Sequence, residues 1–175
     1  PNNLYIWQHL DKDDSYSECV TTSHLIEKWY QQICRKSITV GIQEKTVMDV
    51  QNSIVDMLDK MGRLYAPRQR LRVENTGLDY LISCEMILVQ KEKVGFAHQS
   101  ILDYFMSKRM TEKYYDGQSI EEVIGEKDKQ TPSKRYQVQM FLQNILDYDT
   151  AEFIEAGEQL LVSENVRYYM KFIFY

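Results

Sequence analysis

Residues 94–105 read VGFAHQSILDYF, and this stretch predicts a short strand that leads directly into a helix. Its first residues alternate between large apolar and small side chains, which is typical of a strand. Ser100 and Asp103 then have the spacing of a helix-capping box, and apolar residues follow at helical intervals. His98 therefore lies at the junction of a strand and a helix, in a chain with only two other histidines.

The residues around this junction predict a winged helix. An amphipathic helix is expected over 46–62, ending at a glycine, and a short helix over 76–84. Residues 63–77 contain a proline and a glycine and no helical periodicity, so we expect mostly loop there. "MILVQ", a polar "KEK" turn and "VGFAH" then predict a β-hairpin. The order helix, loop, short helix, hairpin, helix is close to that of a winged helix, with Lys91–Lys93 at the wing tip.

The whole chain is predicted to be mainly α-helical, with the hairpin as its small β element. We expect residues 1–40 to be the end of a helical subdomain, 41–117 the winged helix, and 118–175 a helical arm. The arm opens with a capping box at Ser119 and Glu122, and "DKQTPS" reads as a polar linker. Helices are expected over 134–148, over 150–162 and from Ser163 onward. Stacked helical hairpins of this kind are typical of the start of an α-solenoid.

Composition excludes several classes of function. The formal charge of −5 argues against a chain built to bind nucleic acid, because phosphate contacts need a basic surface. Arg63, Arg68, Arg70 and Arg72 form a basic cluster, but the short helix after them carries Asp79. The three cysteines lack the C-x-x-C spacing of a zinc or redox motif, and no apolar run is long enough for a membrane helix. We therefore expect a cytoplasmic protein with free thiols.

Motifs for catalysis are absent from the sequence. "GIQEKT" lacks the second glycine and the spacing of a phosphate-binding P-loop, so the chain cannot be a nucleotide hydrolase by itself. No G-x-S-x-G elbow surrounds Ser100, and capping explains Ser100 and Asp103 better than a hydrolase triad with His98 does. His9, Cys19 and His24 do not have metal-ligand spacing. We expect no catalytic residues and no metal site.

Residues 1–110 nevertheless resemble the C-terminal half of the NACHT module of STAND-class signal-transduction ATPases, which include the NOD-like receptors and bacterial antiviral sensors. Three segments carry this resemblance. "VGFAHQSILDYFMSKRM" resembles the family's winged-helix signature, in which an aromatic residue, a variable residue and a histidine precede a helix of the type S-x-x-E-Y-F-x-A. "VMDVQNSIVDMLDKMGRLY" resembles the first winged-helix helix, and "PNNLYIWQHL" resembles the N-P-L-x-L segment of the helical subdomain. Asp103 replaces the usual Glu, and Ser107 the usual small apolar residue.

The resemblance implies a regulatory role. In this family the winged-helix histidine contacts the β-phosphate of bound ADP and holds the inactive state, and a proline lies against the adenine. His98 and Pro1 would take these two roles. The resemblance also implies an ATPase core upstream that binds ADP or ATP with Mg²⁺, a sensed ligand bound by downstream repeats, and oligomerisation of the active protein. The alternative from another class is a winged-helix transcription regulator with a helical dimerisation arm.

Overall fold

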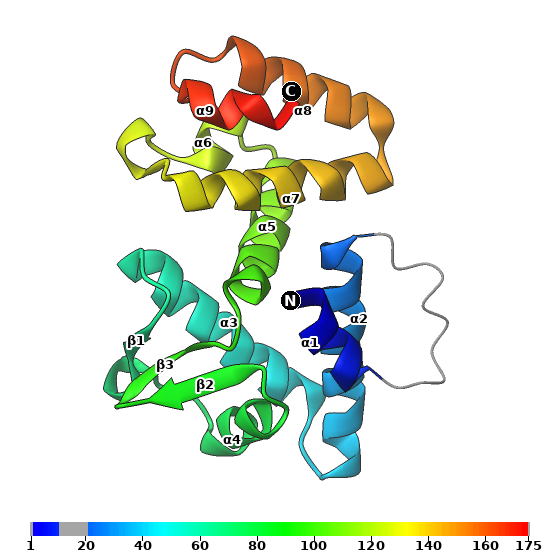
Figure 1. The fold of residues 1–175 in the computed structure, drawn as a ribbon, viewed down its shortest axis with the longest axis vertical. Coiled ribbons are helices and arrows are strands. Elements are labelled where there is room, and N and C mark those ends of the chain that lie inside the picture. The colour runs from blue at the N-terminus through cyan, green and yellow to red at the C-terminus, as the bar shows by residue number, and fades with distance from the viewer. Residues whose placement is uncertain (1, 11–20, 175) are drawn as a thin grey trace. The chain divides into compact units, whose positions relative to one another are not determined.

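The computed structural model describes residues 2–10 and 21–174, which are mainly α-helical with one small antiparallel sheet (Figure 1). This confirms the predicted fold class. The chain divides into two compact units, Pro1–Leu102 (unit 1) and Asp103–Tyr175 (unit 2), and the division falls within one long helix. The three-part division expected from the sequence stays a prediction.

Unit 1 has the element order of a winged helix, preceded by two helices. Its elements are α1 (Asn2–His9), α2 (Thr22–Thr39), α3 (Glu44–Met61), β1 (Ala66–Pro67), the 3₁₀ turn η2 (Arg68–Arg70), α4 (Asn75–Ser83), β2 (Ile87–Gln90), β3 (Lys93–Phe96) and the start of α5 (Gln99–Tyr115). The three strands lie in the order β1-β3-β2, and both pairings are antiparallel. Figure 1 shows this sheet beside α3 and α4.

Apolar residues at helical spacing build the core of unit 1. The buried side chains of α3 recur every three or four residues, which is the pattern of a helix with one face against a core. Gly62 ends α3 in the left-handed conformation at φ 58°, as the sequence predicted. The largest fully buried side chains of this unit come from helices α1 to α5 and from around the start of β2: Ile6, Ile26, Trp29, Ile54, Leu58, Leu78, Leu81, Met86, Ile87 and Ile101.

The hairpin closes through a two-residue turn of Lys91 and Glu92, both at positive φ. Turns of this kind match the right-handed twist of the flanking strands, although glycine and asparagine are the usual residues there. Gly95 lies in the central strand, and a Cβ added to it would meet the Leu64 carbonyl oxygen and the Tyr65 ring, each at 2.5 Å. A side chain at position 95 would therefore prevent this close approach.

One local expectation for unit 1 was wrong, and one short strand was not foreseen. Strand β1 lies in the segment that was expected to be mostly loop; two residues that include a proline give no periodic signal. The expected capping box at the start of α5 does not form, because Ser100 is already inside the helix and Asp103 accepts a hydrogen bond from Gln137 Nε2 at 2.8 Å. The buried Ser100 hydroxyl has no hydrogen-bond partner among residues 2–10 and 21–174.

Unit 2 is a small helical domain with its own core. Besides the rest of α5, it contains α6 (Ile120–Ile124), η3 (Lys127–Lys129), α7 (Pro132–Tyr148), α8 (Thr150–Val162), α9 (Tyr168–Lys171) and η4 (Phe172–Phe174). Figure 1 shows α7 and α8 as an antiparallel pair. The capping box of Ser119 and Glu122 is present, as predicted. The core contains Met110, Ile120, Val123, Ile124, Val138, Phe141, Leu142, Ile145, Ala156, Leu160, Val166 and Met170.

The segment expected as a polar linker contains a buried residue that ties unit 2 together. Gln130 is only 1% exposed, and its amide nitrogen donates to the carbonyls of Gly125 and Asn165. Its amide oxygen accepts from the Arg167 backbone N–H at 2.8 Å. These bonds hold residues 163–167 in a non-helical conformation, so the last helix begins at Tyr168 rather than at Ser163.

Two glycine substitutions test the packing of unit 1. Gly95→Ala should lower the free energy of unfolding by about 2 to 3 kcal/mol, because the new methyl group overlaps backbone and ring atoms. Gly62→Ala meets open space and should cost only about 1 kcal/mol, from the left-handed conformation. Urea unfolding of both variants measures the difference, and equal losses would contradict the close approach at Gly95.

Candidate functional site around His98

His98 is held between the end of β3 and the start of α5. The backbone N–H of Ala97 donates to the Met86 carbonyl at 2.9 Å, which extends the pairing of the hairpin to the residue before His98. The His98 carbonyl accepts from the Ile101 N–H at 3.1 Å in the first turn of the helix. Hydrogen bonds on both sides therefore fix the backbone that carries the imidazole.

A tyrosine from α1 orients the imidazole of His98. The ring centroids of Tyr5 and His98 are 4.5 Å apart at an interplanar angle of 66°, an edge-to-face contact. The Tyr5 ring also lies 4.5 Å from His9 and 6.1 Å from the buried Trp29. The His98 ring is half-buried, and neither of its nitrogens forms a hydrogen bond with residues 2–10 or 21–174. These nitrogens can therefore bind an acceptor outside the described chain.

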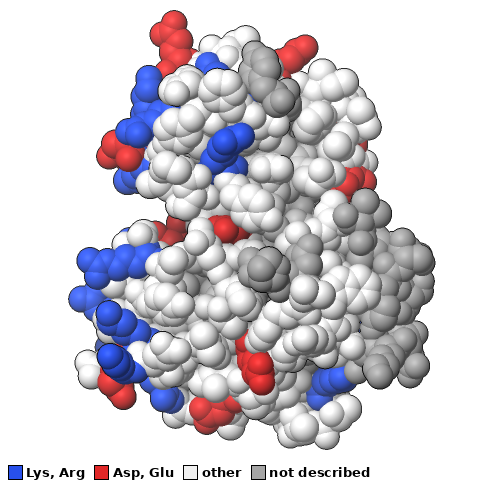
Figure 2. All heavy atoms as spheres, viewed as in Figure 1, with Lys and Arg blue, Asp and Glu red and all other residues white. Residues whose placement is uncertain are grey.

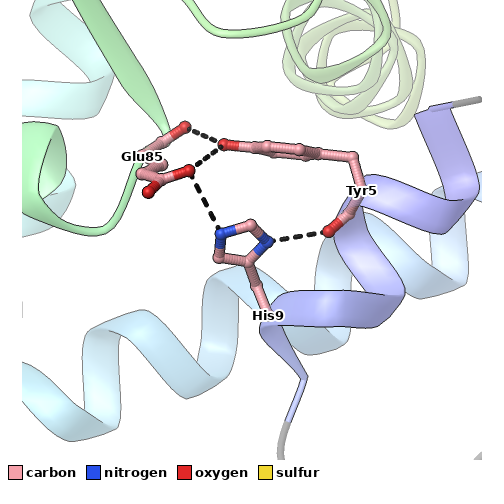
Figure 3. A network of polar contacts seen from close by, with 3 residues as sticks. All are labelled: Tyr5, His9 and Glu85. Atoms are coloured by element: carbon pink, nitrogen blue, oxygen red, sulfur yellow. Dashed lines mark hydrogen bonds and ion pairs between the residues drawn. The ribbon is translucent and has the colours of Figure 1, made fainter.

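Tyr5 is itself anchored by a polar network with His9 and Glu85 (Figure 3). Its hydroxyl donates to the Glu85 backbone carbonyl at 2.7 Å and, less closely, to the Glu85 carboxylate at 3.3 Å. His9 Nε2 lies 3.3 Å from the same carboxylate, and His9 Nδ1 lies 2.7 Å from the Tyr5 carbonyl. Because both neighbours of the His9 ring are acceptors, a doubly protonated ring can donate to each of them.

The backbone of Glu85 links α1 to the end of α4. Glu85 follows Cys84, the C-cap residue of α4, at φ 59°, the left-handed conformation that closes the helix, and its backbone carbonyl is the main acceptor for Tyr5. Its side chain is 63% exposed, so its contact with His9 is largely solvated and contributes little. The backbone hydrogen bond is therefore the stronger link between α1 and the winged helix.

The electrostatics of Tyr5 follow from this position. Burial, and then the charge and hydrogen bond of Glu85, raise the pKa of the Tyr5 hydroxyl to about 12. The hydroxyl is protonated at neutral pH and acts as a donor, so the network remains intact there.

The structure describes one of the two site residues predicted from the sequence. His98 lies at the expected junction, whereas Pro1 lies outside the described residues. Sequence reasoning missed Tyr5, His9 and Glu85 as neighbours of this site. The spacing of Tyr5 and His9 places them on one helical face, but nothing in the sequence relates that face to a residue about 80 positions later.

Other kinds of site receive no support from the described chain. Among residues 2–10 and 21–174, no three His, Cys, Asp or Glu side chains are grouped so that they could hold a metal ion. Within the same residues, every helix is too short or too polar to cross a membrane. The chemistry available around His98 is hydrogen bonding by an oriented imidazole.

Two substitutions separate the backbone bond of Tyr5 from its contact with the carboxylate. Tyr5→Phe should lower the free energy of unfolding by about 1 kcal/mol at pH 7, the net contribution of a typical hydrogen bond. Glu85→Gln keeps the backbone acceptor and should cost less than half as much. Urea unfolding of both variants gives the comparison, and a larger loss for Glu85→Gln would show that the carboxylate is the main anchor.

The raised pKa of Tyr5 predicts a loss of stability at alkaline pH. The folded-state pKa of about 12 lies above the ordinary value of 10, so folding favours the protonated hydroxyl. This contribution is complete below pH 10 and is lost as the pH rises through 12. The difference in stability between wild type and Tyr5→Phe should therefore shrink between pH 10 and pH 12 in urea unfolding. A constant difference would contradict the pKa assigned to Tyr5.

Comparison with known proteins identifies no relative. No family model matches the sequence, and no curated protein and no solved structure matches the chain. The comparisons therefore assign neither a family nor an activity. The function has to be inferred from the residues that surround His98.

Proposed function

We propose that the chain is the nucleotide-state latch of a STAND-class ATPase that acts in signalling or defence. In this role His98 donates a hydrogen bond to the β-phosphate of ADP held by an ATPase core upstream of Pro1. The bond keeps the winged helix against the nucleotide in the resting state. Exchange of ADP for ATP then releases it, because the contact is made in only one of the two states.

One observation carries the proposal: His98 has oriented ring nitrogens without a partner in the described chain. The ring is only half-buried, and neither nitrogen is among the buried polar atoms that lack a partner, so both nitrogens are open to a ligand. The ring is fixed by the edge of Tyr5 and by the backbone on both sides, so little side-chain entropy is lost when it binds a phosphate.

Two further features support a phosphate as the ligand. The N-terminus of α5, a helix of 17 residues, begins directly after His98 and supplies partial positive charge and free backbone N–H groups. Helix α1, whose sequence resembles the adenine-side segment of the family, contacts His98 through Tyr5. The two segments that the resemblance relates to the nucleotide thus belong to the same compact unit.

In this role the chain depends on an ATPase core and on repeats that lie outside it. Without a P-loop it is not an enzyme and does not hold ADP tightly by itself; the P-loop and the Mg²⁺ ligands are contributed by the upstream core. Unit 2 leads to repeats that bind the sensed ligand, and the activated protein forms oligomers in the cytoplasm. The sequence encoded immediately before Pro1 should contain G-x-x-x-x-G-K-S/T.

The competing function, a transcription regulator, is disfavoured by the charge of α4. This helix occupies the position of a recognition helix, yet Glu74 precedes it, and Asp79 is exposed on it. Both acids line a cavity of about 880 Å³ that contains no basic residue. Phosphates would be repelled from this face, so duplex DNA should not bind at micromolar concentration in physiological salt.

His98→Ala tests the latch in a protein that joins this chain to its P-loop core. Loss of a charge-assisted hydrogen bond of about 1.5 to 3 kcal/mol should speed ADP release by about ten- to a hundredfold. The release of a fluorescent ADP analogue, followed by stopped flow with excess unlabelled ADP, measures this rate.

A matched histidine substitution controls for general destabilisation. His24→Ala removes another half-buried histidine, far along the sequence from the junction, and should leave the ADP release rate unchanged. The melting temperature of the nucleotide-free His98→Ala protein should fall only slightly, since the ring loses mainly one aromatic contact. A large fall in melting temperature with an unchanged release rate would refute the latch.

A further inference from the structure

A groove in the winged helix carries a cationic rim. It has a volume of about 420 Å³ and lies between the C-terminal half of α3 and residues 70–72, at the end of η2 and just after it. Its basic lining residues are Lys60, Arg70 and Arg72, and Asp56 is the acid in its lining. The groove is separate from the surroundings of His98, with which it shares no residue.

The basic side chains of the groove are not used within the described chain. Lys60, Arg70 and Arg72 are exposed, and none of them forms an ion pair or a side-chain hydrogen bond with residues 2–10 or 21–174. Figure 2 shows lysine and arginine side chains gathered over the part of unit 1 that contains β1 and the hairpin. In a chain of net charge −5, such a concentration of unpaired cations marks a surface for an anionic partner.

Three other lining residues are apolar, and they are called the floor of the groove below. Met57, Met61 and Leu71 line it, and each is only half-buried in the free chain. Methionine side chains are flexible and polarisable, and they adapt to apolar groups of different shapes. A partner that fills the groove therefore needs an apolar side chain beside its negative charges.

These features favour an acidic peptide over a nucleic acid. Carboxylates of Asp and Glu can bind the planar guanidinium groups of Arg70 and Arg72 through paired hydrogen bonds. A leucine or phenylalanine between them would cover the methionine floor, for which a phosphate backbone has no counterpart. We propose that this groove docks an acidic protein segment with an apolar anchor residue.

Binding of defined probes to the 175-residue chain tests the proposal. The first probe is a fluorescein-labelled peptide of about ten residues, made of glutamate with two leucines, and the second is polyglutamate of equal charge. Fluorescence anisotropy at low salt should show saturable binding of the first probe, weaker binding of the second, and loss of both at high salt. Arg70→Glu combined with Arg72→Glu should weaken binding of the first probe at least about tenfold, because attraction becomes repulsion.

Matched variants locate the site. Lys91→Glu combined with Lys93→Glu makes the same change in net charge on the wing, outside the groove, and should weaken binding less than about threefold. Met57→Gln removes part of the apolar floor without a change in charge, and should affect only the probe with leucines. Urea unfolding confirms that each variant is folded.

Three results would overturn the proposal. The first is no saturable binding of the leucine probe up to about 1 mM. The second is equal losses for the two charge-reversed pairs, which would indicate only diffuse attraction by the net charge. The third is tighter binding of single-stranded or duplex DNA of equal charge, with competition against the peptide, which would make the groove a nucleic-acid surface.

Discussion

The central position of β3 is the constraint on which unit 1 depends. This strand pairs with β1 on one side and β2 on the other, and Gly95 lets the backbone at Leu64 approach it closely. Because β3 is held on both edges, its end is fixed in space, and the chain can pass within two residues from a sheet into the long helix α5. These two anchors fix the backbone of His98, and the ring of Tyr5 then restricts the orientation of its imidazole.

The surroundings of His98 show how an aromatic ring can restrict the orientation of an imidazole without forming a hydrogen bond to it. Tyr5 contacts the imidazole through its ring while its hydroxyl is bound to the end of α4. Ring contact restricts the orientation of the imidazole and leaves both nitrogens available. A hydrogen bond to the imidazole would orient it equally well but would occupy one of the nitrogens that the proposed phosphate contact requires.

The sequence predicts the helices and strands whose apolar residues repeat regularly, and the helix ends that are marked by a specific residue or capping motif. Helices α3 and α8, the hairpin, the Gly62 stop and the Ser119 capping box were all predicted from local patterns. Strand β1, the role of Gln130 and the contact of Tyr5 with Glu85 were not, because each depends on a partner distant in sequence. His98 could be selected from its local context, whereas its neighbours in α1 and at the end of α4 depend on tertiary packing.

The linings of the two cavities beside α3 differ in charge. The cavity at its first turn is lined by Glu74 and Asp79, whereas the groove near its last turn is lined by three basic residues, Lys60, Arg70 and Arg72, and one acid, Asp56. Thr46 and Lys60, which line the two ends, are separated by about 20 Å at the rise of an α-helix. A difference in charge over this separation contributes to the electric dipole of the winged helix. A charged molecule would therefore be turned into a preferred orientation while it approaches the unit, before any contact forms.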